Sequence, residues 1–163
     1  MQTMRALIVP RPGEVEVREV PMPSPGPYQA LVRIEACSFC SSTDLKIIDN
    51  ALPFVSEYPC ILGHESVGTV AEVGEKVRNL APGDRVLRPV AAYPAHRLGE
   101  YMSGWGGFAE YGIVTDAQAM MEDGEQWRQE IGQWPRLQQK VPRDMPAADA
   151  TMLVTLKETL SSL

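Results

Sequence analysis

The sequence predicts a mainly β fold with short helices, and three observations predict it. The chain of 163 residues contains 14 prolines and 13 glycines, spread throughout, which indicates many turns and therefore short elements. Several short runs alternate apolar with polar residues, as strands with one buried face do. Hydrophobic residues make up 44% of the chain, enough to fill one core. We therefore expect one domain of ordinary size rather than two.

The N-terminal part of the chain predicts three strands. Residues 4–9 and 14–20 flank a Pro-Gly turn, so we expect them to form a hairpin. Residues 21–27 carry a proline at every second position, which favours an extended connector. Residues 29–36 show the clearest alternation and predict the third strand.

The middle of the chain predicts a short helix and three more strands. Residues 43–49 have helical spacing, and Ser41, Ser42 and Thr43 are candidate capping residues for that helix. A Pro-Gly turn at residues 82–83 favours a strand directly after it. The expected strands begin at Ser66 and cover residues 85–90 and 108–114.

The C-terminal part has a different character. Residues 122–139 are polar and without a strong period, so we expect a loop with room for one helical turn. Residues 146–163 predict a helix that begins with a proline and carries apolar residues along one side. These apolar residues are Met152, Leu153, Leu156 and Leu160. The chain stops inside this pattern, so we expect the helix to lead into more protein.

The charge balance and the cysteine count exclude several classes of protein. The net charge of −6 argues against binding to nucleic acid or to anionic membranes. No apolar run approaches the ~20 residues of a membrane helix, and the run at residues 4–9 is too short for a signal peptide. Three cysteines fit a reducing compartment better than a disulfide framework. The sequence therefore predicts a cytoplasmic protein.

Three residues form a candidate metal site. His64 and Glu65 are adjacent at the start of an expected strand, and Cys40 follows another strand. A thiolate, an imidazole and a carboxylate together suit a zinc ion that keeps one position open for water or substrate.

A second arrangement of ligands competes with this one. Cys37, Cys40, Cys60 and His64 have the spacing of a closed structural zinc site with three cysteines and one histidine. Two features argue against it. No glycine lies between Cys37 and Cys40 to let the backbone fold round a metal, and residues three apart on a strand point to opposite faces.

The sequence resembles a known family at this point. Gly63-His64-Glu65 followed by Gly68, Gly74 and Val77 is similar to the zinc signature of the medium-chain alcohol dehydrogenases, including sorbitol and threonine dehydrogenases. The resemblance extends over residues 4–163. It implies a GroES-like catalytic domain, a partly open β-barrel, in residues 1–150. Residues 151–163 would then begin a helix that leads into a missing Rossmann domain for the cofactor. Two further matching stretches are residues 73–86 and 106–111.

The resemblance also implies a role for each matching residue. Cys40 and His64 would bind one catalytic zinc, with Glu65 as a third or intermittent ligand. Asp44 would orient the imidazole, and Thr43, with Ser42 as its substitute, would pass the proton of an alcohol outward. NAD or NADP would bind through the missing domain, so no cofactor-binding residue is expected here. The cysteines of the family's structural zinc lobe are absent, so no structural zinc is expected.

The sequence departs from the family at a few positions. Two residues rather than one separate Cys40 from the Thr43-Asp44 pair, and Lys46 stands where a histidine is common. Many polyol dehydrogenases carry a glutamate near the position of Val154, and here Glu158 follows one helical turn later as a possible further ligand.

These matches lead to an expected function and two alternatives. We expect a dehydrogenase acting on a small alcohol or carbonyl compound, inactive as this segment alone and homo-oligomeric in its full-length form. One alternative is a reductase domain of the same fold without zinc. The other is a non-catalytic GroES-like binding module with the structural zinc site described above.

Overall fold

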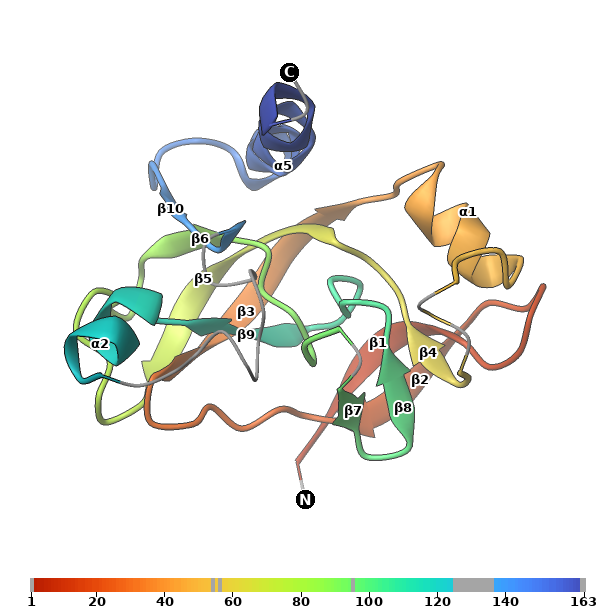
Figure 1. The fold of residues 1–163 in the computed structure, drawn as a ribbon, viewed down its shortest axis with the longest axis horizontal. Helices are drawn as coiled ribbons and strands as arrows, with labels where there is room; N and C mark the ends of the chain where they lie inside the picture. Colours follow the sequence, from red (N-terminus) through yellow and green to blue (C-terminus); the bar gives the residue numbers. More distant parts are fainter. Residues whose placement is uncertain (1, 54, 56, 95, 125–136, 162–163) are drawn as a thin grey trace.

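Two five-stranded sheets make up most of the protein (Figure 1). The computed structural model describes residues 2–53, 55, 57–94, 96–124 and 137–161. The first sheet has the order β2-β1-β4-β8-β7, with strands β1 (Thr3–Val9), β2 (Glu16–Pro21), β4 (Cys60–Ile61), β7 (Arg97–Leu98) and β8 (Tyr101–Ser103). The second has the order β10-β6-β5-β3-β9, with strands β3 (Gln29–Ser38), β5 (Glu65–Val73), β6 (Arg85–Leu87), β9 (Tyr111–Thr115) and β10 (Lys140–Val141). The mainly β prediction is confirmed.

The two sheets are joined by the segment at residues 107–110, which crosses from one to the other. The Leu7 amide donates to the Phe108 carbonyl at 2.8 Å, and the Ile34 amide donates to the Glu110 carbonyl at 2.9 Å. Residues 107–110 therefore pair with β1 on one side and with β3 on the other. The two sheets meet at this crossing, and the fold is the partly open barrel of a GroES-like domain.

The longer strands follow the sequence pattern with two differences, and the short strands β4, β7, β8 and β10 were not expected from the sequence. β1 and β2 form the expected antiparallel hairpin. The strand expected at residues 85–90 ends at Leu87, because Arg88 has a φ of 55° and leaves the extended region; Val90 returns to pair with Ile113. The strand expected at residues 108–114 begins only at Tyr111, because the residues before it form the crossing between the sheets.

The first helix lies where the sequence predicts it. α1 covers Thr43–Ile48, and Ser42, one of the expected capping residues, occupies the N-cap position. Its side chain makes no capping hydrogen bond. The carboxylate of Asp44 instead accepts a hydrogen bond from the Cys40 amide at 2.9 Å.

The second helix, α2 (Ala117–Glu122), was not expected from the sequence. It begins at Asp116, whose side chain accepts hydrogen bonds from the amides of Arg78, Asn79 and Ala119 and from the Asn79 side chain, at 2.7–3.0 Å. This carboxylate therefore ties α2 to the loop before β6. Most of the loop expected at residues 122–139 lies outside the described residues.

Replacing Asp116 by asparagine tests this tie. Burial raises the pKa of Asp116, but its hydrogen bonds outweigh burial and hold that pKa below its ordinary value. A lowered folded-state pKa stabilises the protein above the unfolded-state pKa, and this contribution is lost as the pH falls through the folded-state pKa. We expect Asp116→Asn to lower the free energy of unfolding by about 1–3 kcal/mol at pH 7. The difference in this free energy between the wild type and the variant should narrow below about pH 4. Urea unfolding across that range measures it.

The exposed Asp144 supplies the control for this experiment, since Asp144→Asn removes a carboxylate from the surface of the same chain. We expect little change in the urea midpoint for this variant. A gap between Asp116→Asn and the wild type that stays constant down to pH 3 would show that the Asp116 charge contributes nothing.

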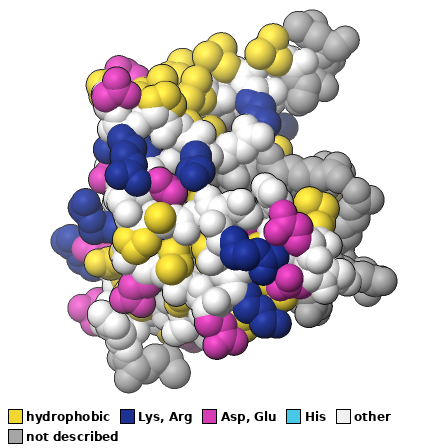
Figure 2. Space-filling model, turned by 90° about the vertical axis from the view of Figure 1, so that its left-hand side faces the viewer, with side chains coloured by type: hydrophobic (Ala, Val, Ile, Leu, Met, Phe, Trp, Pro, Cys, Tyr) yellow, Lys and Arg dark blue, Asp and Glu magenta, His cyan; other side chains and the backbone are white. Residues whose placement is uncertain are grey.

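The C-terminal helix α5 (Ala147–Ser161) packs on the second sheet and lies at the top of Figure 1. Ala150 and Val154 are buried against Val67 of β5 and Leu87 of β6. The apolar side expected from the sequence is largely exposed instead, at Met152, Leu156 and Leu160. Figure 2 shows hydrophobic side chains in a row along this top edge. Among the described helices, none combines the length and the apolar character needed to cross a membrane.

Candidate metal centre

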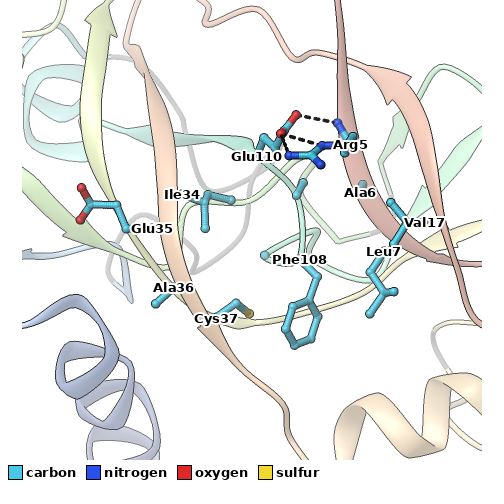
Figure 3. Close-up of a pocket in the computed structure, with 12 residues that line it drawn as sticks. Arg5, Ala6, Leu7, Val17, Ile34, Glu35, Ala36, Cys37, Phe108 and Glu110 are labelled. Atoms are coloured by element: carbon cyan, nitrogen blue, oxygen red, sulfur yellow. Dashed lines mark hydrogen bonds and ion pairs between the residues drawn. The ribbon is translucent and has the colours of Figure 1, made fainter.

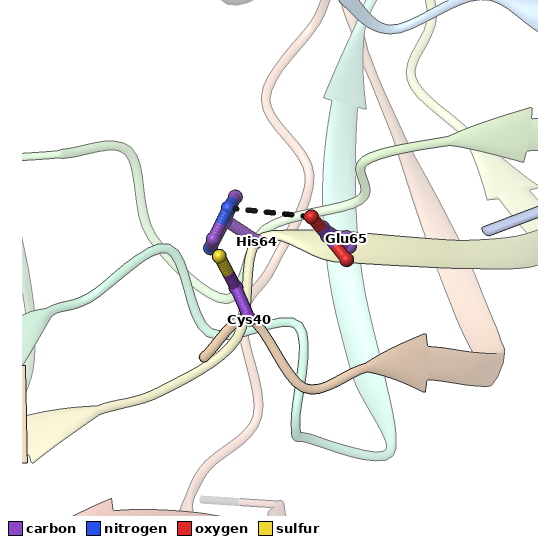
Figure 4. Close-up of side chains that lie close together, drawn as sticks. All are labelled: Cys40, His64 and Glu65. Carbon is purple, nitrogen blue, oxygen red and sulfur yellow. Dashed lines mark ion pairs between the residues drawn. The ribbon is translucent and has the colours of Figure 1, made fainter. Parts of the chain in front are cut away.

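The pairing of β3 with β5 brings the predicted ligand residues together. Ser38, at the end of β3, lies opposite Glu65, at the start of β5, so Cys40 emerges beside His64. The ligand atoms of Cys40, His64 and Glu65 all lie within 4.8 Å of one another (Figure 4). This is the group of three potential metal ligands found among the described residues. His64 and Glu65 are buried, and Cys40 is half-buried.

The turn after β3 fixes the cysteine. The Asp44 carboxylate accepts a hydrogen bond from the Cys40 amide at 2.9 Å, and the Thr43 amide donates to the Cys40 sulfur at 3.4 Å. These two hydrogen bonds fix the backbone of the turn and the position of the Cys40 sulfur. The extra residue between Cys40 and Thr43 is therefore accommodated in a turn that still presents the thiol.

The residue before His64 has to be a glycine. Gly63 has a φ of 96°, and a Cβ placed on it would lie 2.6 Å from the Phe108 amide nitrogen. Any other residue would clash with the crossing at residues 107–110. This close approach bends the chain at the start of β5, where His64 and Glu65 both face the site.

His64 lies between an acid and an aromatic ring. Its Nδ1 is 3.9 Å from Asp44 Oδ1, and both atoms are buried without a hydrogen-bond partner. The other ring nitrogen, Nε2, is 3.9 Å from Glu65 Oε1. The Trp105 ring packs against the imidazole with ring centroids 5.2 Å apart. The imidazole is thus held with Nε2 toward Glu65 and Nδ1 toward Asp44.

The arrangement fits a zinc ion. Two ligands of one tetrahedral zinc lie about 3.3–3.8 Å apart, because each bond is about 2.0–2.3 Å long. The measured separations need only small side-chain rotations to reach these values. A histidine that binds a metal through one nitrogen donates the proton on the other to a carboxylate or carbonyl. The unpaired Asp44 Oδ1 is placed to accept that proton from Nδ1.

Arg88 is a buried cation beside the cluster that sequence reasoning did not find. It forms an ion pair with Glu158 of α5, and its charge also interacts with Glu65. Burial lowers the pKa of Arg88 to about 10, and the negative charge of Glu65 acts in the opposite direction. The one signal in the sequence was an arginine inside the otherwise apolar run at residues 86–90.

Cys37 and Cys60 are not part of the group of three ligand residues. Cys37 lines an open hollow of about 330 Å³ between β1 and β3, and its sulfur points toward Phe108 (Figure 3). Cys60 packs with Val9 and Ile47. Burial raises the pKa of both thiols, that of Cys60 to about 12. A thiol with a raised pKa is a poor metal ligand near neutral pH, because the thiolate is the form that binds.

The remaining predicted residues lie at different distances from the chemistry. Thr43 is half-buried and contacts the Cys40 sulfur through its amide, whereas Ser42 is exposed. Glu158 is directed to Arg88 and does not join the group of three ligand atoms. Of the predicted site residues, the structure therefore brings together Cys40, His64 and Glu65, with Asp44 beside His64.

The fold and this cluster define a GroES-like β-barrel domain with a candidate mononuclear metal centre. A family model described as the alcohol dehydrogenase GroES-like domain matches residues 26–122. The chain belongs to that family.

Several curated proteins are similar in sequence. Sheep sorbitol dehydrogenase is 40% identical over 82 residues, which is 50% of this chain and 23% of the relative. A zinc-type alcohol dehydrogenase-like protein of Schizosaccharomyces pombe is 43% identical over 86 residues, covering 52% of this chain and 20% of the relative. Acryloyl-coenzyme A reductase of Sulfurisphaera tokodaii is 35% identical over 122 residues, covering 66% of this chain and 36% of the relative. The chain thus spans 20–36% of the length of these relatives.

Solved structures share the fold over most of this chain. A protein of Sinorhizobium meliloti described as a zinc-binding dehydrogenase, bound to NADP, has a TM-score of 0.65 at 25% identity. The match covers 93% of this chain and 42% of that protein. A thermostable alcohol dehydrogenase of Pyrobaculum aerophilum with cobalt and zinc has a TM-score of 0.63 at 23% identity, over 94% and 45% of the two chains, and shares the fold.

Proposed function

We propose that this chain is the zinc-binding catalytic domain of a dehydrogenase that oxidises an alcohol or polyol to a carbonyl compound with NAD or NADP. The observation that carries the proposal is the group of Cys40, His64 and Glu65, whose ligand atoms lie within 4.8 Å of one another. Family membership and the similarity to sorbitol dehydrogenase support it. A small alcohol or carbonyl compound is the proposed substrate.

Each residue near the cluster has a proposed role. Cys40 and His64 hold one catalytic zinc, and Glu65 is a third or intermittent ligand. Asp44 accepts the Nδ1 proton of His64 and so keeps Nε2 free to bind. Thr43, with the exposed Ser42 beside it, offers a hydroxyl that can carry the alcohol proton toward solvent. A zinc ion held by these residues would supply Lewis acidity toward an alcohol hydroxyl, and a nicotinamide cofactor would supply the hydride acceptor.

The cofactor is proposed to bind in a separate domain beyond residues 1–150. The greater length of the relatives and the NADP bound to the S. meliloti protein support this view. The exposed apolar residues of α5, Met152, Leu156 and Leu160, would pack against such a domain. Residues 151–163 would then belong to the connection between the two parts.

Metal content tests the proposal on this chain alone. After removal of metal and incubation with zinc, we expect one zinc per chain for the wild type and a loss of binding in His64→Ala. Substitution by cobalt should give a thiolate-to-cobalt charge-transfer band, because the proposed ligand set contains one thiolate. Elemental analysis and the absorption spectrum are the two measurements.

Different outcomes favour the alternatives. No bound zinc in the wild type would favour a reductase domain without metal. The hydride-transfer part is tested separately on the whole protein, by following reduced nicotinamide with a panel of alcohols and polyols. Absence of turnover in a zinc-loaded whole protein would leave the binding module as the better description.

A further inference from the structure

Helix α5 forms one wall of the metal centre. It lies over β3 and β5, and Thr151 fixes its position through a hydrogen bond of 2.5 Å between its hydroxyl and that of Ser38. Thr151 is buried, and it lies on the face of α5 that also carries Val154. Thr155 follows Val154 in the helix and lies four residues after Thr151. The docking of α5 therefore places Thr155 beside the start of β5.

Thr155 forms a hydrogen bond with the carboxylate of Glu65. Its hydroxyl donates a hydrogen bond of 3.0 Å to Glu65 Oε1. The same oxygen lies 3.9 Å from His64 Nε2, so it is the Glu65 oxygen that faces the other ligands (Figure 4). A hydroxyl bound to this atom holds the Glu65 side chain in one rotamer and leaves the other lone pair of the oxygen for a metal.

The charge of a buried cation that is paired with α5 also acts on the Glu65 carboxylate. The Arg88 cation interacts with Glu65 and is paired with Glu158, which lies one helical turn after Thr155. Without the hydroxyl of Thr155, the attraction between Arg88 and Glu65 is opposed by one restraint fewer. Loss of the hydrogen bond from Thr155 would leave the Glu65 carboxylate less firmly held beside His64.

We propose that Thr155 is a positioning residue for Glu65, and that α5 and the metal centre are coupled through this hydrogen bond. The inference rests on the proposed zinc site and adds a residue outside the predicted ligands. The coupling is reciprocal: if α5 improves the affinity for zinc, then bound zinc stabilises α5 to the same extent.

Three variants of this chain test the proposal. Thr155→Val removes the hydroxyl and keeps the shape, whereas Thr155→Ser keeps the hydroxyl. Thr159→Val is the matched control, because the Thr159 hydroxyl donates to the Thr155 carbonyl at 2.9 Å and not to Glu65. In competition titrations of zinc against a chromophoric chelator, we expect Thr155→Val to bind zinc about tenfold more weakly and the other two within about twofold of the wild type.

Hydrogen exchange of the α5 amides distinguishes this coupling from a purely structural role of Thr155, which would not make the exchange depend on zinc. Adding zinc should slow exchange of the α5 amides in the wild type and in Thr155→Ser, and much less in Thr155→Val. Equal zinc affinity in Thr155→Val and the wild type would overturn the inference and leave the zinc site intact. Equal weakening in Thr155→Val and Thr159→Val would also overturn it, as an effect of helix stability. If the wild type binds no zinc, the metal centre and this inference fail together.

Discussion

Replacing Cys40 by serine is expected to abolish zinc binding. The hydroxyl of serine is a far weaker zinc ligand than a thiolate, and Cys40 is the only cysteine in the group of three ligand atoms found among the described residues. We expect the zinc affinity to fall by at least about 100-fold, more than loss of a supporting residue costs. The measurement is a competition titration, together with loss of the charge-transfer band in the cobalt form.

Cys60→Ser is the matched control. This thiol is buried with Val9 and Ile47, so the added hydroxyl should lower the stability of the fold by about 1–3 kcal/mol while zinc binding is retained. Urea unfolding of the metal-free variant separates the two effects. Equal loss of zinc in Cys40→Ser and Cys60→Ser would contradict the open site and favour the closed one with three cysteines and His64.

Gly68→Ala is expected to destabilise the second sheet strongly, because the added methyl group would clash with the backbone of β3. Gly68 lies in the centre of β5, between Ile34 of β3 and Val86 of β6. A Cβ at this position would lie 2.4 Å from the Arg33 carbonyl oxygen, closer than real Cβ contacts come. Because the obstacle is backbone, relief requires β3 and β5 to separate. We expect a loss of about 3 kcal/mol or more, which lowers the melting temperature by about 6–12 °C.

The effect should extend to the metal, because the β3–β5 ladder is what places Cys40 beside His64. Zinc affinity of Gly68→Ala should therefore fall as well. Gly26→Ala is the control, since its added methyl group meets only the flexible end of Gln29, at 3.3 Å. A melting temperature of Gly68→Ala equal to that of Gly26→Ala would refute the argument.

Local patterns in the sequence predicted the strands and the ligands well. Alternation located β2, β3 and β5, because side chains along a strand with one buried face are apolar at every second position. Cys40, His64 and Glu65 come from the ends of two such strands, so an antiparallel pairing was enough to bring them together. The resemblance to a family supplied the rest.

The contacts that sequence reasoning missed are those between distant segments. Arg88 adopts a φ of 55° and ends its strand early, which no local propensity of an arginine predicts. Thr155 meets Glu65 across 90 positions of the chain, and periodicity carries no information on such a contact.

Helix α5 shows a further limit of pattern reading. The large apolar residues Met152, Leu156 and Leu160 are exposed, whereas the smaller Ala150 and Val154 face the sheet. A helix with apolar residues on two sides does not reveal which side packs on its own domain.

The crossing at residues 107–110 has a consequence for the order in which the protein folds. Its pairing with β1 joins residues about a hundred positions apart in the sequence. β3 and β5 are much closer in sequence, because only residues 39–64 lie between them. Pairings between near segments form faster than those between distant ones. The β3–β5 ladder, which places Cys40 beside His64, can therefore form before the barrel closes. During synthesis, both side chains would then be in place to bind a metal before residue 110 is added to the chain.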